Sequence, residues 1–233
     1  MPTALIAGGL GVTGRALVEY LDADPDWQVV ALSRRAPDFK TGARFISVDL
    51  LDTADTRAKL GGLTDVTHVF HCALSARPDV AEEIAPNVAM LENMLDAVEP
   101  VADLRHVQLM QGAKWYGTFL GSYKTPAKED DPRPPVRQFY HAQQDWLVDR
   151  RNGQSWSWSA RRPHGVWCFS VGGGMNLLPS VALYAAVSKH RGDALCWPGT
   201  QGFYDCLYNI VDVSLLARAM HWAATEPRAA DNA

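Results

Sequence analysis

The sequence lacks the features of a membrane protein, a secreted protein or a nucleic-acid-binding protein. No apolar run approaches the roughly 20 residues that cross a bilayer. The N-terminus has no basic segment followed by an apolar core, as a signal peptide would have. The net charge is −4, so no overall basic charge indicates binding to nucleic acid or to a membrane surface. We therefore expect a cytoplasmic protein with neither of these partners.

Cysteine is scarce, and internal repeats and low-complexity segments are absent. The four cysteines, Cys72, Cys168, Cys196 and Cys206, lie far apart with no Cys-x-x-Cys pair. This pattern favours free thiols in a reducing compartment over disulfides, and it predicts no metal site. A chain of 233 residues with 47% hydrophobic residues suits one globular α/β domain, with room for a small appended lobe.

Glycine is concentrated at the start of the chain. The apolar run from Ala4 to Ala7 is followed by Gly8, Gly9, Gly11 and Gly14, and a helical pattern begins at once. A strand, a glycine turn and a helix in this order predict the phosphate-binding start of a dinucleotide fold. The spacing fits both Gly9-x-Gly11-x-x-Gly14, the ordinary fingerprint, and Gly8-x-x-Gly11-x-x-Gly14, the version found in extended short-chain dehydrogenases. Gly8, Gly11, Val12 and Gly14 are therefore candidate cofactor-binding residues.

The end of the second predicted strand indicates which dinucleotide is bound. Residues 27–32 form that strand, and Ser33-Arg34-Arg35 follow it. An acidic residue here would accept from the ribose hydroxyls of NAD, whereas arginine neutralises the 2′-phosphate of NADP. The two arginines and the missing acid favour NADP over the alternative of an exposed basic loop.

Three further parallel strands are predicted by apolar runs at residues 43–48, 65–73 and 104–110. Asp49 and Leu50 end the first of these, where a carboxylate can meet adenine. Asp52 is expected to cap a helix that begins near Thr53. Residues 73–76, beginning with Ala73, are expected to pass beneath the cofactor. His68 and His71 belong to the second of these strands, and we expect them to be packed or partly exposed rather than catalytic.

The later part of the chain supplies candidate residues for chemistry. Lys114 follows the strand at 104–110, at the edge where open α/β sheets place their ligands. A helix is expected to open at residue 138 and a strand to cover residues 155–160. Pro163, Gly165 and Val166 then suit a loop that covers one face of a nicotinamide. Helices are predicted at 177–188 and at 213–224, the latter on the substrate side, with short strands at 195–199 and 204–210.

Several stretches together resemble one family, the progesterone 5β-reductase and iridoid synthase-like enzymes of the extended short-chain dehydrogenases. The matching stretches are Gly8-Gly-Leu-Gly-Val-Thr-Gly14, Ser33-Arg-Arg35, Gly112-Ala-Lys-Trp-Tyr116, Gln138-Phe-Tyr-His-Ala-Gln-Gln-Asp145, Arg162-Pro-His-Gly-Val166, Phe169-Ser170, Met175-Asn176 and Pro198-Gly199. The resemblance covers the whole chain. It implies a Rossmann fold, which is a doubly wound parallel sheet, with an incomplete substrate lobe.

The resemblance also implies NADPH as cofactor and the reduction of an activated C=C bond in a small apolar enone or enal. Hydride goes to the β-carbon, while a lysine and a tyrosine hold the carbonyl oxygen as the enolate forms. Fixed donors aimed at an oxygen on which charge develops stabilise a transition state. Lys114 matches the family lysine.

The tyrosine motif departs from the family pattern Asn-Phe-Tyr-Tyr-x-x-Glu-Asp. Tyr140 aligns with the first tyrosine and His141 with the second, which we take as catalytic, while Gln144 replaces the glutamate. Three alternatives stay open: Tyr140 supplies the phenol after a small shift, His141 supplies the proton, or the activity is altered. Histidine can donate a hydrogen bond and titrates near neutrality. His141 can also simply begin a helix.

We expect an NADP-binding domain at residues 1–170, to which a strand near 208–212 returns, and a mainly substrate-side segment at 171–233. Family members continue beyond this point, so we expect a truncated lobe. Trp146, Trp156 and Trp158 can lie at a homodimer interface or in the core.

Two other functions stay open. The first is a carbonyl reductase or an epimerase-like enzyme, although the usual Tyr-x-x-x-Lys is missing because Gln144 follows Tyr140. The second is an NADP-binding protein without turnover.

Overall fold

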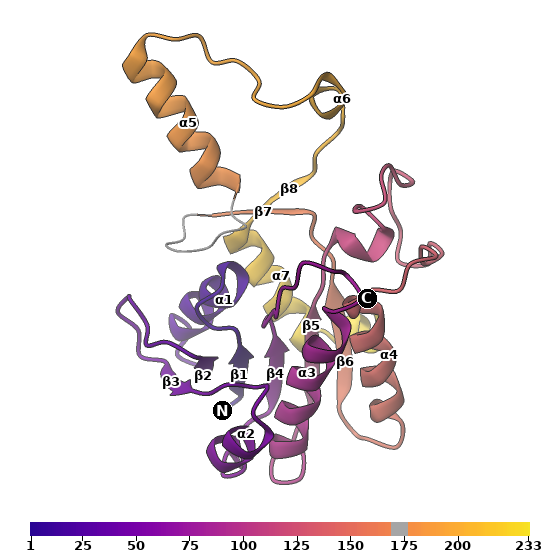
Figure 1. Cartoon of the computed structure of the whole chain (residues 1–233). Helices are drawn as coiled ribbons and strands as arrows, with labels where there is room; N and C mark the ends of the chain where they lie inside the picture. Colours follow the sequence, from indigo (N-terminus) through magenta and orange to yellow (C-terminus); the bar gives the residue numbers. More distant parts are fainter. Residues whose placement is uncertain (169–176) are drawn as a thin grey trace.

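The computed structural model describes residues 1–168 and 177–233, and its main element is a six-stranded parallel sheet (Figure 1). The strands are β1 (Thr3–Ala7), β2 (Gln28–Ser33), β3 (Arg44–Ser47), β4 (His68–His71), β5 (His106–Met110) and β6 (Ser157–Arg161). Their order in the sheet is β3-β2-β1-β4-β5-β6. The chain therefore reverses direction across the sheet at β1, and ligands of such folds bind outside the strand ends at this point. The predicted doubly wound α/β fold is confirmed.

Helices cover both faces of this sheet (Figure 1). The helices α2 (Thr53–Leu60), α3 (Ile84–Val98) and α4 (Phe139–Arg151) share one apolar core with one face, and α1 (Val12–Asp22) and α7 (Val213–Thr225) share a second core with the other. The strands between these layers are apolar on both sides, as expected for a parallel sheet that is covered twice.

The inner strands lie close to where the sequence predicts them. All five residues of β1 and all four of β4 are buried. His68 and His71 are therefore packed inside the sheet layers, as the sequence predicts. The predicted cap of α2 is also confirmed, because the Asp52 side chain accepts the Asp55 N–H at 2.9 Å.

The expectation that the helix at 213–224 lies on the substrate side is wrong. Helix α7 packs along α1, and Leu216, Ala217, Met220 and Ala224 belong to the core that also contains β1. Its apolar side packs on the sheet face opposite α2, α3 and α4, so burial there stabilises the main sheet. The last helical turn, η2 (Pro227–Ala229), follows α7, and Asn232 pairs beside β6 in an isolated bridge with Ser159.

A second, two-stranded sheet lies outside the main one. It pairs β7 (Gly165–Trp167) in parallel with β8 (Ile210–Asp212). Between these strands the chain forms α5 (Leu177–Arg191) and α6 (Gln201–Tyr204), which extend beyond the carboxyl ends of the main strands (Figure 1). The strands predicted at 195–199 and 204–210 are wrong as predicted. Residues 195–199 form no strand, and Thr200 caps the short helix α6 by accepting the Phe203 N–H.

The tryptophans considered for an interface serve the core instead. Trp156 and Trp158 are buried in the core beneath α3 and α4, and Trp146 packs against it. These side chains therefore supply no argument for a homodimer. Within the described ranges 1–168 and 177–233, no helix is both long and apolar enough to cross a membrane.

Candidate active site at the carboxyl ends of the strands

The glycine loop between β1 and α1 is packed so closely that side chains would not fit. Gly8 has a φ of +79°, and a Cβ on it would lie 2.9 Å from backbone atoms of Cys72 and Ala73. A Cβ on Gly14 would lie 2.2 Å from the Gly8 oxygen. The helix therefore begins directly against the strand end. This cradle fits the backbone approach that a pyrophosphate needs.

The N-terminus of α1 has no side chain that competes for its N–H groups. Gly11 is the N-cap residue and makes no side-chain cap, and the first turn, which begins at Val12, contains no acidic residue. The free N–H groups and the positive end of the helix dipole can therefore serve an anion. Gly8, Gly11, Val12 and Gly14 meet at this one point, as a dinucleotide site requires.

Two arginines are available at the end of β2. Ser33 Oγ accepts the Arg35 N–H at 3.1 Å, which fixes the turn, and both Arg34 and Arg35 are exposed. Within the described part of the chain, neither guanidinium forms an ion pair. In contrast, nearby Arg15 is paired with Glu19 and Asp38 at 3.0 and 3.1 Å. No described residue therefore neutralises the charges of Arg34 and Arg35.

The remaining residues predicted for the adenine side lie at neighbouring strand ends. Asp49 follows β3, and its Oδ1 accepts the Leu51 N–H at 3.1 Å, which leaves its other carboxylate oxygen for a ligand. Leu50 is buried, so only its backbone is available, and its oxygen accepts from Asn93 at 2.8 Å. Ala73 follows β4 and lies directly against Gly8.

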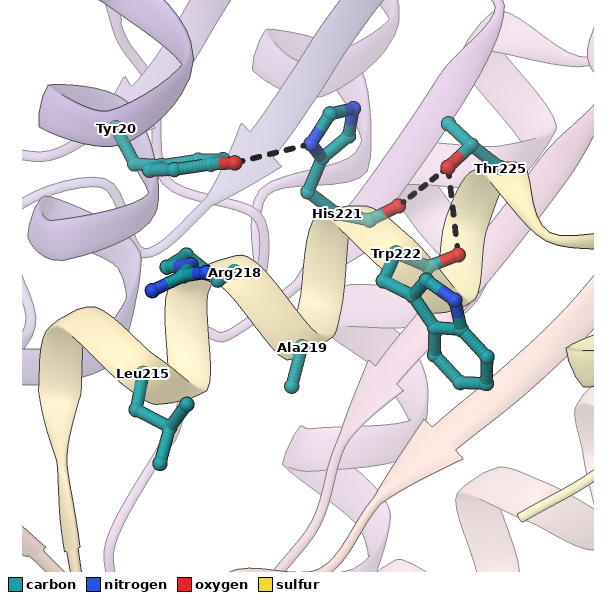
Figure 2. Close-up of a pocket in the computed structure, with 7 residues that line it drawn as sticks. All are labelled: Tyr20, Leu215, Arg218, Ala219, His221, Trp222 and Thr225. Carbon is teal, nitrogen blue, oxygen red and sulfur yellow. Dashed lines mark hydrogen bonds between the residues drawn. The ribbon is translucent and has the colours of Figure 1, made fainter.

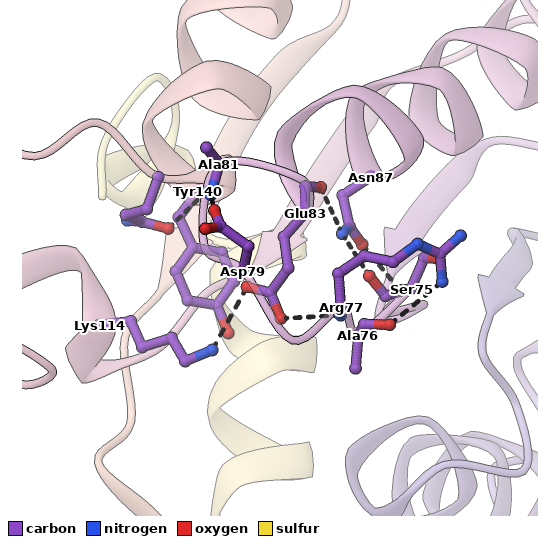
Figure 3. Close-up of polar contacts among 10 residues, drawn as sticks. Ser75, Ala76, Arg77, Asp79, Ala81, Glu83, Asn87, Lys114 and Tyr140 are labelled. Carbon is purple, nitrogen blue, oxygen red and sulfur yellow. Dashed lines mark hydrogen bonds and ion pairs between the residues drawn. The ribbon is translucent and has the colours of Figure 1, made fainter.

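Lys114 and Tyr140 come together beside a buried glutamate. Lys114 lies on the short helix η1 (Ala113–Tyr116) after β5, and Tyr140 lies in the first turn of α4. Lys114 Nζ is 3.4 Å from Glu83 Oε2, and Figure 3 shows the Tyr140 ring beside this ion pair. Burial and then the negative charge of Glu83 raise the pKa of Tyr140. A tyrosine phenol is protonated at neutral pH even at its ordinary pKa of about 10, so Tyr140 can donate a hydrogen bond.

The backbone around Gly112 brings these two side chains together. A Cβ on Gly112 would lie 3.3 Å from the Tyr140 hydroxyl and 3.4 Å from the Pro163 oxygen. The Pro163 oxygen accepts the Ala113 N–H at 3.0 Å, so the loop after β6 holds η1 in place. Gln138 Oε1 accepts the Tyr140 N–H at 2.8 Å and begins α4. Pro163 thus contributes to the site by fixing the element that carries Lys114.

His141 points elsewhere. Its ring is buried, and Nε2 lies 3.0 Å from the backbone oxygen of Trp115, so Nε2 carries the proton that it donates there. The ring also packs edge-on against the Trp115 indole at 4.6 Å between centroids. Burial lowers the pKa of His141, while the bond to the Trp115 carbonyl acts in the opposite direction. His141 supports η1 from behind, whereas Tyr140 lies beside Lys114 and Glu83.

Gln144, which stands where the family motif has glutamate, joins a polar network below η1. Its Oε1 accepts from Gln111 Nε2 at 3.1 Å and from Arg162 at 3.2 Å. Arg162 also donates to Gln111 Oε1 at 2.9 Å, and its guanidinium stacks over Trp115 at 3.7 Å from the ring centroid. These contacts connect β5, β6 and α4, and they restrain the element that holds Lys114.

Gly165 and Val166 form part of β7 rather than an open loop. A Cβ on Gly165 would lie 2.6 Å from the Tyr208 ring, and the Gly165 N–H donates to the Asn209 oxygen at 3.0 Å. The absence of a side chain on Gly165 therefore makes room for Tyr208. Val166 packs against the core near α7. The motif residues Phe169, Ser170, Met175 and Asn176 lie outside the described residues.

A separate hollow of about 570 Å³ lies between α1 and α7 (Figure 2). Its lining residues are Tyr20, Leu215, Arg218, Ala219, His221, Trp222 and Thr225. Two of these side chains are in contact, because the Tyr20 hydroxyl lies 3.3 Å from His221 Nδ1. None of the predicted site residues lines it, so we do not assign it to the cofactor or the substrate.

A family model for the NAD dependent epimerase/dehydratase family matches residues 4–232. The chain belongs to this family. The match covers the glycine cradle, η1 and the start of α4, so the geometry described above is that of a dinucleotide-binding enzyme family.

Two relatives are similar along nearly the whole chain. The (S)-8-oxocitronellyl enol synthase ISY1 of Nepeta racemosa is 36% identical over 99% of this chain and 63% of its own length. The 3-oxo-Delta(4,5)-steroid 5-beta-reductase of Arabidopsis thaliana is 35% identical over the same shares. The resemblance inferred from the motifs is therefore confirmed. The chain spans less than two thirds of the length of these relatives.

Solved structures with low sequence identity share the fold. UDP-glucose 4-epimerase from Brucella ovis in complex with NAD matches 100% of this chain and 76% of its own, with a TM-score of 0.74 and 21% identity. The Bordetella bronchiseptica enzyme WbmG in complex with NAD matches 99% of this chain and 71% of its own, with a TM-score of 0.74 and 19% identity. At this identity the likeness establishes the fold alone.

Sequence reasoning missed Glu83. No motif contains it, and it precedes Lys114 by 31 residues. An acidic residue before a predicted helix is ordinarily interpreted as a cap, so only the tertiary structure places it beside Lys114 and Tyr140.

Proposed function

We propose that this chain carries the catalytic site of an NADPH-dependent reductase of small apolar α,β-unsaturated carbonyl compounds. The observation that carries the proposal is the convergence of Lys114 and Tyr140 beside Glu83, at the same edge of the sheet as the glycine cradle (Figure 3). The names of the similar relatives, an enol synthase and a steroid 5-beta-reductase, support the same class of reaction.

The residues at the strand ends suit the cofactor. Gly8, Gly11, Val12 and Gly14 would hold the pyrophosphate, because the close packing at Gly8 and Gly14 sets the start of α1 against the strand end and its first N–H groups have no side-chain partner. Arg34 and Arg35, with Ser33, would bind the 2′-phosphate, since their charges are unpaired within the described residues. Asp49, Leu50 and Ala73 would border the adenine and the loop below it. The cofactor supplies a hydride when bound.

The side chains of the protein act on the carbonyl oxygen of the substrate. When the β-carbon gains hydride, the C=C electron pair moves toward the carbonyl and negative charge develops on its oxygen. Lys114 and Tyr140 donate hydrogen bonds to this oxygen and stabilise the enolate. A proton at the α-carbon then completes the saturated carbonyl product. We assign the phenol role to Tyr140 and a supporting role to His141, because His141 donates to the Trp115 carbonyl.

The carbonyl reductase and epimerase alternative has less support. Those enzymes need a lysine four residues after the tyrosine, and here that residue is Gln144, which is bound by Gln111 and Arg162. A cytoplasmic location and a homodimer stay predictions from the sequence.

The test is NADPH oxidation by the purified chain with a panel of enones and enals, followed by product analysis. We expect a saturated carbonyl product and a loss of kcat of about 100-fold or more in Lys114→Ala and Tyr140→Phe, the scale found when a donor to an oxyanion is removed. Lys128→Ala and Tyr20→Phe are matched controls, because Lys128 is exposed and Tyr20 lies on α1 in the separate hollow.

Three other outcomes of this test would argue against the proposed function. An alcohol product would favour the carbonyl reductase alternative. NADPH binding with no turnover of any substrate would favour an NADP-binding protein without catalysis. Absence of binding to either dinucleotide would refute the proposal.

A further inference from the structure

A buried carboxylate lies beside the two proposed donors, and the functions assigned so far do not account for it. The Glu83 side chain is 5% exposed, whereas that of Lys114, its ion-pair partner at 3.4 Å, is 41% exposed. Burying a carboxylate is costly, and an ion pair with a partly exposed ammonium compensates poorly. A contribution to stability alone therefore explains this residue badly.

Glu83 is held firmly relative to the helix that carries Tyr140. The Arg77 N–H donates to Glu83 Oε1 at 3.4 Å, and Asn87 Nδ2 donates to the Glu83 backbone oxygen at 2.7 Å. Asn87 also binds both backbone groups of Ser75 at 2.9 Å. Gln143 Nε2, on α4, donates to the Asn87 backbone oxygen at 2.8 Å. These bonds join the loop after β4, the start of α3 and α4 into one unit around Glu83.

The charges nearby cannot substitute for Glu83. Figure 3 shows Arg77 and Asp79 on the segment that precedes α3. The Arg77 guanidinium donates to the Ala76 oxygen at 3.1 Å, and the Asp79 carboxylate accepts the Ala81 N–H at 2.6 Å. Glu83 is thus the carboxylate that attracts the Lys114 ammonium. Its negative charge also opposes ionisation of Tyr140, in addition to burial, and so raises the pKa of that phenol.

We propose that Glu83 is a positioning residue for the reduction: it holds the Lys114 ammonium beside the Tyr140 hydroxyl. This inference rests on the proposed function. Donors that are oriented before the substrate arrives need no reorganisation when charge develops on the carbonyl oxygen, which is the source of their effect on the rate. Glu83 itself acts through Lys114 and Tyr140 and needs no contact with the substrate.

The first test compares Glu83→Gln with Glu82→Gln in the full chain. Gln keeps the shape and removes the charge, and Glu82 is an exposed neighbour that forms no ion pair among the residues described. We expect Glu83→Gln to lower kcat by about 10- to 100-fold, because a small misplacement of a catalytic group can cost up to about 100-fold. KM for the enone, the Kd for NADPH and Tm should match those of Glu82→Gln. Glu83→Asp, which keeps the charge, should recover part of kcat.

The second test does not depend on turnover. Reductive methylation with ¹³C-formaldehyde labels the lysines without removing their charge, and Lys114→Arg assigns the Lys114 signal. We expect this signal to shift in Glu83→Gln and to stay in place in Glu82→Gln. A shift without enone reduction by the unmodified chain would defeat the proposed function while preserving the Glu83–Lys114 coupling.

Three results would overturn the positioning role. The first is a kcat of Glu83→Gln within about twofold of the Glu82→Gln value, well below the effect of a group that assists catalysis. The second is a Lys114 signal that does not move. The third is a parallel loss of NADPH binding and Tm in both Glu83→Gln and Glu83→Asp, which would show that the residue serves folding.

Discussion

His141 Nε2 lies 3.0 Å from the backbone oxygen of Trp115, the residue that follows Lys114. The two neighbouring residues of the tyrosine motif therefore have different surroundings: the His141 side chain faces the back of η1, whereas Tyr140 lies beside Lys114. A residue that aligns with a catalytic position in the sequence thus has a supporting position in the structure.

We predict that His141→Leu destabilises the protein by about 1–3 kcal/mol, because the Trp115 carbonyl loses its buried donor. His141→Gln keeps an N–H near that carbonyl and should cost less. Urea unfolding measures the free energy of unfolding of both variants. Tyr140→Phe is the contrasting variant and should lose kcat with little change in Tm. A His141→Gln variant that is stable but has lost turnover as completely as Tyr140→Phe would return the proton-donor role to His141.

Gly14→Ala is predicted to impair cofactor binding and stability together. The new Cβ would lie 2.2 Å from the Gly8 oxygen, so α1 must move away from β1. Overpacking of this kind typically costs about 1–3 kcal/mol. Gly62→Ala is the matched control, because a Cβ there meets nothing within 4 Å. Dinucleotide titration gives the Kd and thermal unfolding gives the Tm of both variants. Equal values for Gly14→Ala and Gly62→Ala would contradict the interpretation of the cradle.

Arg34→Ala combined with Arg35→Ala should weaken NADPH binding more than NADH binding. NADPH carries a 2′-phosphate that NADH lacks, and the double variant removes both arginines that would bind it. Each hydrogen bond to a charged group contributes about 1.5–3 kcal/mol to the binding free energy. The Kd for NADPH should therefore rise at least about tenfold, since 1.4 kcal/mol corresponds to that factor. Arg57→Ala combined with Lys128→Ala, two exposed sites outside the predicted cofactor site, controls for the loss of two positive charges. Equal losses for NADH and NADPH would show that these arginines do not select the cofactor.

The protein should lose stability as the pH falls from about 6.5 toward 4. Burial is the main cause that lowers the pKa of His68 and His71 to about 4 and that of His106 to about 3, from an ordinary value of 6.5. Between these pKa values and 6.5, the histidines bind protons in the unfolded chain but stay neutral in the folded chain. Acid therefore favours unfolding. The loss should be on the order of 1 kcal/mol per pH unit for each histidine.

Urea unfolding at pH 7.5, 6 and 5 measures this loss. Replacing His106 by Gln should flatten the acid dependence by the share of one histidine, although the replacement itself can change stability at neutral pH. A dependence that stays equally steep without His106 would show that His106 does not contribute to the acid sensitivity.

The glycine spacing, the apolar strands and the caps of this protein follow from local rules. Gly8, Gly11 and Gly14 predict the cradle because only glycine permits that turn and that close packing, and the structure has them in those positions. Asp52 predicts the start of α2 for an equally local reason, since its side chain reaches an N–H three residues away.

Contacts between distant segments were decided only by the tertiary structure. Helix α7 has an apolar side that fits any apolar surface, and the sequence does not say that the surface is α1 and the sheet. The different directions of the neighbours Tyr140, toward Lys114, and His141, toward the Trp115 carbonyl, depend on which way the first turn of α4 faces η1. Glu83 meets Lys114 across 31 residues because β5 and α3 are neighbours in space, and no periodicity along the chain records that proximity.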